Sequence, residues 1–96
     1  MKKFNMNDFV KVKLSSKGAE IKNAINSKTN KFLEDNEIKD IKKLKEDYTE
    51  GDIYEAQLWE LMSEFGECLI VGGEAPFIDN NIYFDNKYLE DAEVEL

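Results

Sequence analysis

A single cysteine, Cys68, stands in a chain of 96 residues that contains no histidine, and this feature constrains the fold more than any other. One thiol cannot form an intramolecular disulfide, and the chain has no set of thiol and imidazole ligands for a structural zinc ion. The fold must therefore rest on hydrophobic burial. A chain of this length buries only somewhat more than about 60% of its unfolded surface, so we expect one modestly stable domain over residues 1–96.

Residues 1–48 predict one strand followed by two helices. The segment FVKVKL (9–14) alternates apolar residues and lysines with a period of two, as in a strand with one buried face. The segment SSKGAEIKNAI (15–25) predicts a helix with Ser15 or Ser16 as its N-cap. Polar residues without a period predict a loop or break at 26–30, and the apolar spacing within 31–48 predicts a second, amphipathic helix.

The second half contains the strongest periodic signal in the chain. After a turn at TEGD (49–52), in which Asp52 is a candidate N-cap, the segment IYEAQLWELMSEFG (53–66) has apolar residues at helical spacing. Gly66 is placed to end this helix. We expect the helix to organise the core through Tyr54, Leu58, Leu61, Met62 and Phe65.

Short strands are predicted toward the C-terminus. An apolar run at 68–71 predicts a buried strand, and FIDNNIYF (77–84) predicts a hairpin that turns at 79–81. Residues 85–96 predict an acidic edge strand or a solvated tail. Together the elements predict an α+β fold, a small single domain with two or three helices packed on a short antiparallel sheet.

The charge is divided unevenly between the two halves of the sequence. Residues 1–45 hold twelve lysines against six acids, whereas residues 46–96 hold one lysine against fifteen acids, and the whole chain has a net charge of −8. Every cation is a lysine. Lysine lacks the planar fork with which arginine recognises phosphate or guanine, so sequence-specific DNA reading is disfavoured.

The residue types of the chain give little support for a catalytic or cofactor-binding site. The absence of histidine removes the commonest general base near neutral pH and the commonest metal ligand. Cys68 lies in an apolar run, which favours a buried inert thiol over a nucleophile. The acidic stretch from Asp79 lacks the glycine of a calcium loop, since Phe84 stands at the sixth position. We therefore expect no enzymatic activity, no cofactor and no bound metal.

The acids of the C-terminal quarter are the candidate partner-binding residues. A dense field of one sign costs self-repulsion, and it is stabilised when it meets a lysine- or arginine-rich groove built for phosphates. An acidic surface that serves only solubility is the alternative, and composition alone favours it. Trp59 is a further interface candidate if it is exposed. The acids of the candidate surface are Glu74, Asp79, Asp85, Glu90, Asp91, Glu93 and Glu95.

Two segments, NDFVKVKLSSKG (7–18) and QLWELMSEFGE (57–67), with GGEAPF (72–77) after them, resemble small uncharacterised proteins encoded in phages and prophages of low-GC Gram-positive bacteria. Such short acidic phage proteins include anti-CRISPR proteins, some of which imitate DNA and occupy the groove where a CRISPR nuclease reads the protospacer-adjacent motif. The resemblance implies a non-enzymatic inhibitor in the cytoplasm of an infected bacterium. It transfers no individual site residue.

Three hypotheses for function follow. The first is an inhibitor whose acids bind the basic nucleic-acid channel of a host CRISPR effector nuclease, with no direct contact to nucleic acid. The second is a structural or assembly module that associates through its positive and negative halves. The third is an accessory protein that binds a small ligand near VGGEAPF (71–77). No apolar run is long enough for a signal peptide or a membrane span, which favours a reducing, intracellular setting.

Overall fold

The structure, a computed structural model, describes residues 1–69 and 73–93. Two helices pack against antiparallel sheets, so the predicted α+β class is confirmed. None of the helices in the described residues is long and apolar enough to cross a membrane.

A three-stranded antiparallel sheet forms the centre of the molecule. Its middle strand is β2 (Phe9–Lys13), which pairs with β3 (Ile53–Gln57) on one side and β4 (Tyr83–Phe84) on the other. Val10 and Val12 are buried, and the alternate residues Phe9, Lys11 and Lys13 are exposed. The strand predicted from alternation is therefore confirmed.

The helix predicted over 53–66 is only half present. Residues 53–57 are strand β3 and continue directly into helix α2 (Leu58–Phe65), which ends at Gly66 as expected. The prediction was wrong for 53–57 because these residues pair antiparallel with β2 along their whole length, from Phe9 opposite Gln57 to Lys13 opposite Ile53. Asp52 therefore precedes a strand and caps no helix. The turn before it is present, with Gly51 at a φ of 91°.

The core lies between the sheet and α2. Its buried members are Val10, Val12, Leu14, Ala19, Leu61, Phe65 and Phe77. Leu61 and Phe65 are fully buried, and the rings of Phe65 and Phe77 meet edge to face with centroids 5.2 Å apart. Helix α2 thus supplies Leu61 and Phe65 to the core as predicted, whereas Leu58 and Tyr54 are only half-buried against it and Met62 is not among its members.

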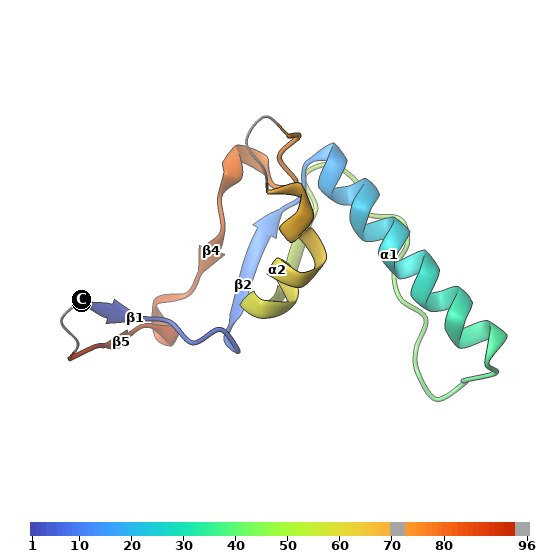
Figure 1. The fold of residues 1–96 in the computed structure, drawn as a ribbon, viewed down its shortest axis with the longest axis horizontal. Coiled ribbons are helices and arrows are strands. Elements are labelled where there is room, and N and C mark those ends of the chain that lie inside the picture. The colour runs from blue at the N-terminus through green and yellow to red at the C-terminus, as the bar shows by residue number, and fades with distance from the viewer. Residues whose placement is uncertain (70–72, 94–96) are drawn as a thin grey trace.

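Helix α1 (Ser16–Asp35) projects from this core. Ser15 is its N-cap, and the Ser15 side chain accepts a hydrogen bond from the backbone N–H of Gly18. The helix runs through residues 26–30, so the predicted loop or break there is wrong. The second predicted helix is also wrong beyond Asp35, since 36–48 have no helical structure and run back along α1 (Figure 1).

Three asparagines explain both errors. Asn23, Asn26 and Asn30 lie on one side of α1, and their side-chain amides donate to the backbone carbonyls of Tyr48, Lys45 and Leu44 at 2.7 to 2.9 Å. Asn23 and Asn30 also accept hydrogen bonds from the backbone N–H groups of Tyr48 and Leu44. This asparagine ladder supplies the backbone partners that residues 44–48 would otherwise find within a helix of their own.

The two predicted strands of the 77–84 hairpin pair with β2 and the residue after it, and not with each other. Phe77 forms a bridge with Leu14, and β4 follows with Val10 opposite Phe84. The predicted hairpin is therefore wrong, although Asp79 and Asn80 do adopt the positive φ expected of its turn. The strand predicted at 68–71 is wrong for its first two residues, because Cys68 ends a 3-10 turn and Leu69 is exposed. Its remainder falls outside the described residues.

The two ends of the described chain meet in a second, two-stranded sheet. Strand β1 (Lys2–Lys3) pairs antiparallel with β5 (Glu90–Asp91), so Lys2 stands opposite Asp91 and Lys3 opposite Glu90. Glu95 falls outside the described residues.

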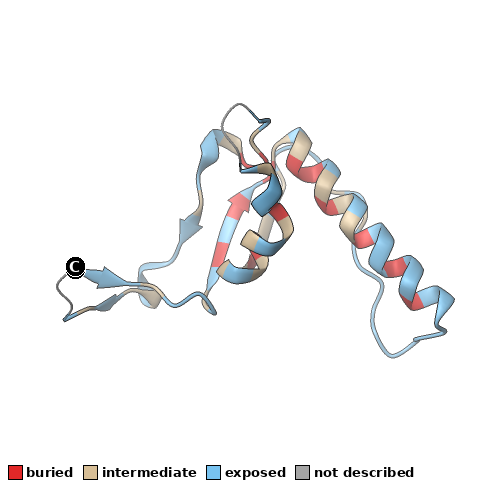
Figure 2. Ribbon diagram, in the orientation of Figure 1, coloured by how far each residue is buried: buried red, intermediate tan, exposed pale blue. Residues whose placement is uncertain are grey.

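The molecule has an elongated shape with two parts. We call residues 16–48 the arm and residues 1–15, 49–69 and 73–93 the body; Figure 2 shows that burial concentrates in the body and along one side of α1. The extents are 50 × 34 × 20 Å and the radius of gyration is 15.8 Å, compared with about 13 Å for a compact domain of 100 residues.

Candidate functional site

The predicted acidic residues lie along the outer edge of the body. Glu74, Asp79, Asp85 and Glu93 are all exposed, and none of them forms an ion pair within the part of the chain that the structure describes. Glu74 lies near the start of α1, where it lines a pocket with Lys17, and the chain after it passes along β4 to β5, on the side of β2 away from α1 (Figure 1). They follow one edge and do not converge on a single point.

Glu90 and Asp91 differ from the other predicted residues because lysines neutralise them. Asp91 pairs with Lys2, and Glu90 Oε2 lies 3.6 Å from Lys3 Nζ. These four side chains are largely exposed, so each pair contributes little stability. The pairs nevertheless reduce the negative charge that β5 presents to a partner.

The two oppositely charged halves of the sequence neutralise each other in part within the chain. Of the seven ion pairs among residues 1–69 and 73–93, six join a lysine of residues 1–45 to an acid of residues 46–96. The charge asymmetry along the sequence therefore does not become an equal asymmetry in space.

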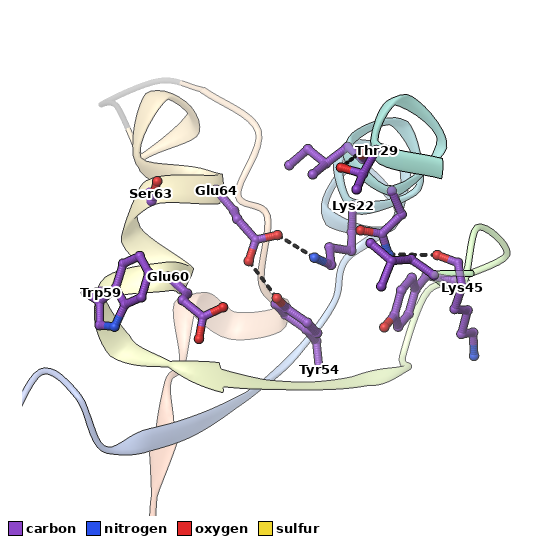
Figure 3. A pocket seen from close by; sticks show the side chains of 12 residues that line it. Lys22, Thr29, Lys45, Tyr54, Trp59, Glu60, Ser63 and Glu64 are labelled. Atoms are coloured by element: carbon purple, nitrogen blue, oxygen red, sulfur yellow. Dashed lines mark hydrogen bonds and ion pairs between the residues drawn. The ribbon is translucent and has the colours of Figure 1, made fainter. Parts of the chain in front are cut away.

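A groove between the arm and α2 is a second candidate site that the sequence analysis did not identify. It has a volume of about 470 Å³ and is lined by side chains from α1, β3, α2 and the returning segment at 44–48. Figure 3 shows Trp59, Glu60 and Glu64 from α2 on one wall, opposite Lys22 and Thr29 from α1. Four segments separated in sequence thus contribute to one concave surface.

A buried ionic network joins the two walls. Lys22 Nζ donates to Glu64 Oε2 at 2.5 Å, and the hydroxyl of Tyr54 donates to Glu64 Oε1 at 2.6 Å. The same ammonium lies 4.5 Å from the centre of the Tyr54 ring. The side chains of Lys22 and Glu64 are only 10% and 16% exposed, so the network is desolvated and links α1, α2 and β3 firmly.

The network holds the Tyr54 hydroxyl in its neutral form. Burial raises the pKa of Tyr54 well above its ordinary value, and the hydrogen bond to Glu64 and the negative charges of Glu64 and Glu60 act in the same direction. A neutral phenol that donates to a carboxylate is a structural role and does not suit a general base at neutral pH.

Trp59 lies at the rim of the groove with 47% of its surface exposed. Its indole N–H donates to Gln57 Oε1 at 3.0 Å, and the Gln57 amide donates to the backbone carbonyl of Asn7 at 2.9 Å. These bonds fix the orientation of the ring. The condition that made Trp59 an interface candidate, its exposure, is therefore met.

Asn26 contributes an incompletely satisfied group to the groove. Its amide nitrogen donates to the Lys45 carbonyl at 2.7 Å, but Asn26 Oδ1 is buried and accepts no hydrogen bond from the described residues. Most buried polar side-chain atoms have a partner, and an unsatisfied one costs about 1 to 3 kcal/mol. The other two asparagines of the ladder use both ends of their amides.

The sequence held one signal for this site. Asn23, Asn26 and Asn30 are spaced by three and four residues, which places them on one side of a helix. Because residues 26–30 are all polar, they were predicted as a loop or break, and the helical spacing of the asparagines was not recognised. The partners of these asparagines are backbone groups, whose position no residue type reveals.

Neither a metal-binding cluster among the described residues nor similarity to a known protein adds to the assignment of these two sites. Within residues 1–69 and 73–93, no group of three or more carboxylate or thiol side chains is arranged to hold a metal ion. Comparisons of the chain with models of protein families, with curated proteins and with solved structures find no significant match.

Proposed function

We propose that this chain is a non-enzymatic inhibitor that binds the basic nucleic-acid channel of another protein by acidic mimicry of DNA. The resemblance to small phage proteins indicates the target class, a host CRISPR effector nuclease, and the cytoplasm of the infected bacterium as the place of action. The observation that carries the proposal is the location of the charge within the fold.

The negative charge is concentrated in the body. Residues 1–15 and 49–93 contain five lysines and thirteen carboxylate side chains, a net charge of −8, whereas the arm contains eight lysines and seven carboxylate side chains, a net charge of +1. Double-stranded DNA carries one negative charge per about 1.7 Å of its axis. A positively charged groove that binds DNA also attracts a protein body that is negatively charged like DNA. This attraction acts over roughly a Debye length, about 8 Å at physiological salt.

The exposed carboxylates along the outer edge are the groups best placed to imitate phosphates. Glu74, Asp79, Asp85 and Glu93 stay solvated, so a partner's lysines and arginines reach them without breaking contacts inside the body. Asp85 Oδ1 accepts the backbone N–H of Lys87, which holds that carboxylate in place. Glu90 and Asp91 contribute only if a partner competes with Lys3 and Lys2.

The two alternative functions have less support. Head-to-tail assembly through charged halves would draw on the charges that remain unpaired among the described residues, and six ion pairs already join the halves within one chain and reduce that number. A ligand site near VGGEAPF falls partly outside the described residues.

The test is competition for DNA. Immobilised protein is exposed to purified, guide-loaded CRISPR effector nucleases, and each captured nuclease is then assayed for binding to its target duplex. The proposal expects capture, loss of DNA binding, and an affinity that falls steeply with added salt. A set of nucleases that all bind DNA normally in its presence would refute the proposal for this target class.

Matched amide variants locate the surface. The edge variant combines Glu74→Gln, Asp79→Asn, Asp85→Asn and Glu93→Gln, and the arm variant combines Glu34→Gln, Asp35→Asn, Glu37→Gln and Asp40→Asn. Both remove four exposed, unpaired charges of the described residues. At about 0.2 to 1 kcal/mol for each exposed charge pair, the edge variant loses about 0.8 to 4 kcal/mol, roughly fourfold to several hundredfold in affinity. Equal losses in the two variants would show that net charge, and not this edge, drives binding.

A further inference from the structure

We propose that the groove between α1 and α2 binds the guanidinium group of an arginine side chain presented by a partner protein. This site is separate from the acidic edge, because the edge follows β4 and β5 on the side of β2 away from α1 (Figure 1). Three observations support the assignment: the balance of charge in the groove, the exposed face of Trp59, and the unsatisfied oxygen of Asn26.

The charges that line the groove leave one negative charge uncompensated. Lys22 is neutralised by Glu64, and Lys45 Nζ lies 3.8 Å from Asp52 while also lying over the Tyr48 ring. Glu60 lines the groove and forms no ion pair among residues 1–69 and 73–93. The surface is therefore complementary to one positive charge. An anion finds no free cation here, because both lysines are already engaged.

Trp59 supplies a flat surface beside that charge. It directly precedes Glu60 in α2, and Figure 3 shows both side chains at the same end of the groove. The hydrogen bond to Gln57 fixes the indole, so a ligand need not order the ring on binding. A guanidinium group stacks on an aromatic face and donates hydrogen bonds in its own plane at the same time, which an ammonium group does not.

Asn26 Oδ1 supplies an acceptor on the opposite wall. It is buried in the free protein, so a ligand reaches it only when side chains of that wall move aside. A donor that reaches this oxygen removes the cost of leaving it unsatisfied. Guanidinium has five N–H donors, so hydrogen bonds remain available for a second acceptor when one edge of the group pairs with Glu60.

The experiment uses Trp59, the single tryptophan of the chain, as its reporter. A capped pentapeptide with a central arginine is titrated into the intact protein while the fluorescence is recorded, and the citrulline peptide, neutral and of the same shape, is titrated in parallel. We expect saturable quenching with the arginine peptide only. In NMR spectra, the side-chain amide of Asn26 should shift along the same binding curve.

Two pairs of variants connect the signal to the groove. Glu60→Gln should weaken arginine-peptide binding by about two- to fivefold, the range for an ion pair near the surface, while Glu67→Gln, which is exposed and outside the groove, leaves it unchanged. Trp59→Ala, followed by NMR, should weaken it by about two- to fivefold through the lost cation–π contact. Phe32→Ala, on the exposed side of α1, serves as the control for that change.

Equal binding of the arginine and citrulline peptides would overturn the proposal, as would an unchanged affinity after Glu60→Gln. Agmatine that binds more tightly than the peptide would overturn the assignment to a protein partner and identify a free guanidine compound as the occupant. These outcomes do not depend on the acidic edge, since no nuclease is present. Failure here and failure of the proposed inhibitor function are therefore distinguishable.

Discussion

Breaking the Lys22–Glu64 pair should destabilise the protein more than any exposed ion pair would. Lys22→Met leaves Glu64 without its cation, and Glu64→Gln leaves the ammonium of Lys22 without its counter-charge, in a site where neither side chain is more than 16% exposed. Removing one member of a buried pair costs about 3 to 5 kcal/mol. Residual exposure favours the lower end, so we expect about 3 kcal/mol for each single substitution.

The double variant should be no worse than either single one. Lys22→Met with Glu64→Gln leaves no charge unpaired, and the amide oxygen still accepts the Tyr54 hydroxyl, now bonded to Glu64 Oε1 at 2.6 Å. Neutral replacements for a buried pair are often nearly neutral in stability. The magnitude of the coupling free energy between the two positions should therefore be at least about 3 kcal/mol.

Urea unfolding followed by Trp59 fluorescence and far-UV circular dichroism measures these values. A total stability of about 5 to 15 kcal/mol leaves the single variants folded. The control is the exposed pair Lys17–Glu20, 3.8 Å apart, where the same substitutions should couple by less than about 0.5 kcal/mol. Single effects below about 1 kcal/mol, or single effects that simply add in the double variant, would refute the idea that this pair is desolvated.

The spacing of apolar residues was sufficient to predict a helix or strand where that element buries one face along its whole length. The alternation in 9–14 predicts β2 because one face of the strand meets a continuous core, and the spacing of Leu58, Leu61 and Phe65 predicts α2 for the same reason. The apolar periodicity at 31–48 failed because the residues that produce it are not buried. Ile38, Ile41 and Leu44 are 37 to 56% exposed.

Contacts between distant segments could not be predicted from composition. The acids of 85–93 appeared to lack local neutralisation, but Asp91 meets Lys2 across 89 positions of sequence. The groove likewise depends on α1 and α2 lying side by side, and Lys22 and Glu64 are 42 residues apart. The sequence therefore indicated which residue types carry charge but not which charges remain free.

Three further predictions concern stability. Gly18→Ala should cost about 1 to 3 kcal/mol despite its better helix propensity, because the new Cβ would lie 2.0 Å from the Pro76 carbonyl oxygen, whereas Gly66→Ala, with open space around it, should be neutral or stabilising by up to about 1 kcal/mol in urea unfolding. Because the folded-state pKa of Tyr54 is raised, its contribution is present below the unfolded pKa of about 10 and is lost as pH rises above it; Tyr54→Phe should flatten the alkaline limb of stability against pH, and Tyr83→Phe should not. The backbone N–H of Thr49, followed by Lys45, lowers the pKa of Asp52, so its contribution is present above pH of about 4 and is lost on acidification; Asp52→Asn should reduce the acid sensitivity of the melting temperature.

The acidic edge and the groove should affect binding through different rate constants if one partner contacts both. Exposed charges act mainly on association, because they attract the partner before contact, so the four edge substitutions should lower the association rate and weaken its dependence on salt. A stacked and hydrogen-bonded arginine acts after contact, so Trp59→Ala and Glu60→Gln should raise the dissociation rate and leave association nearly unchanged. Surface plasmon resonance with a captured nuclease separates the two effects. If the edge and groove variants both changed only the dissociation rate, the edge would be an ordinary contact surface, and long-range mimicry of DNA would no longer be needed to explain its charge.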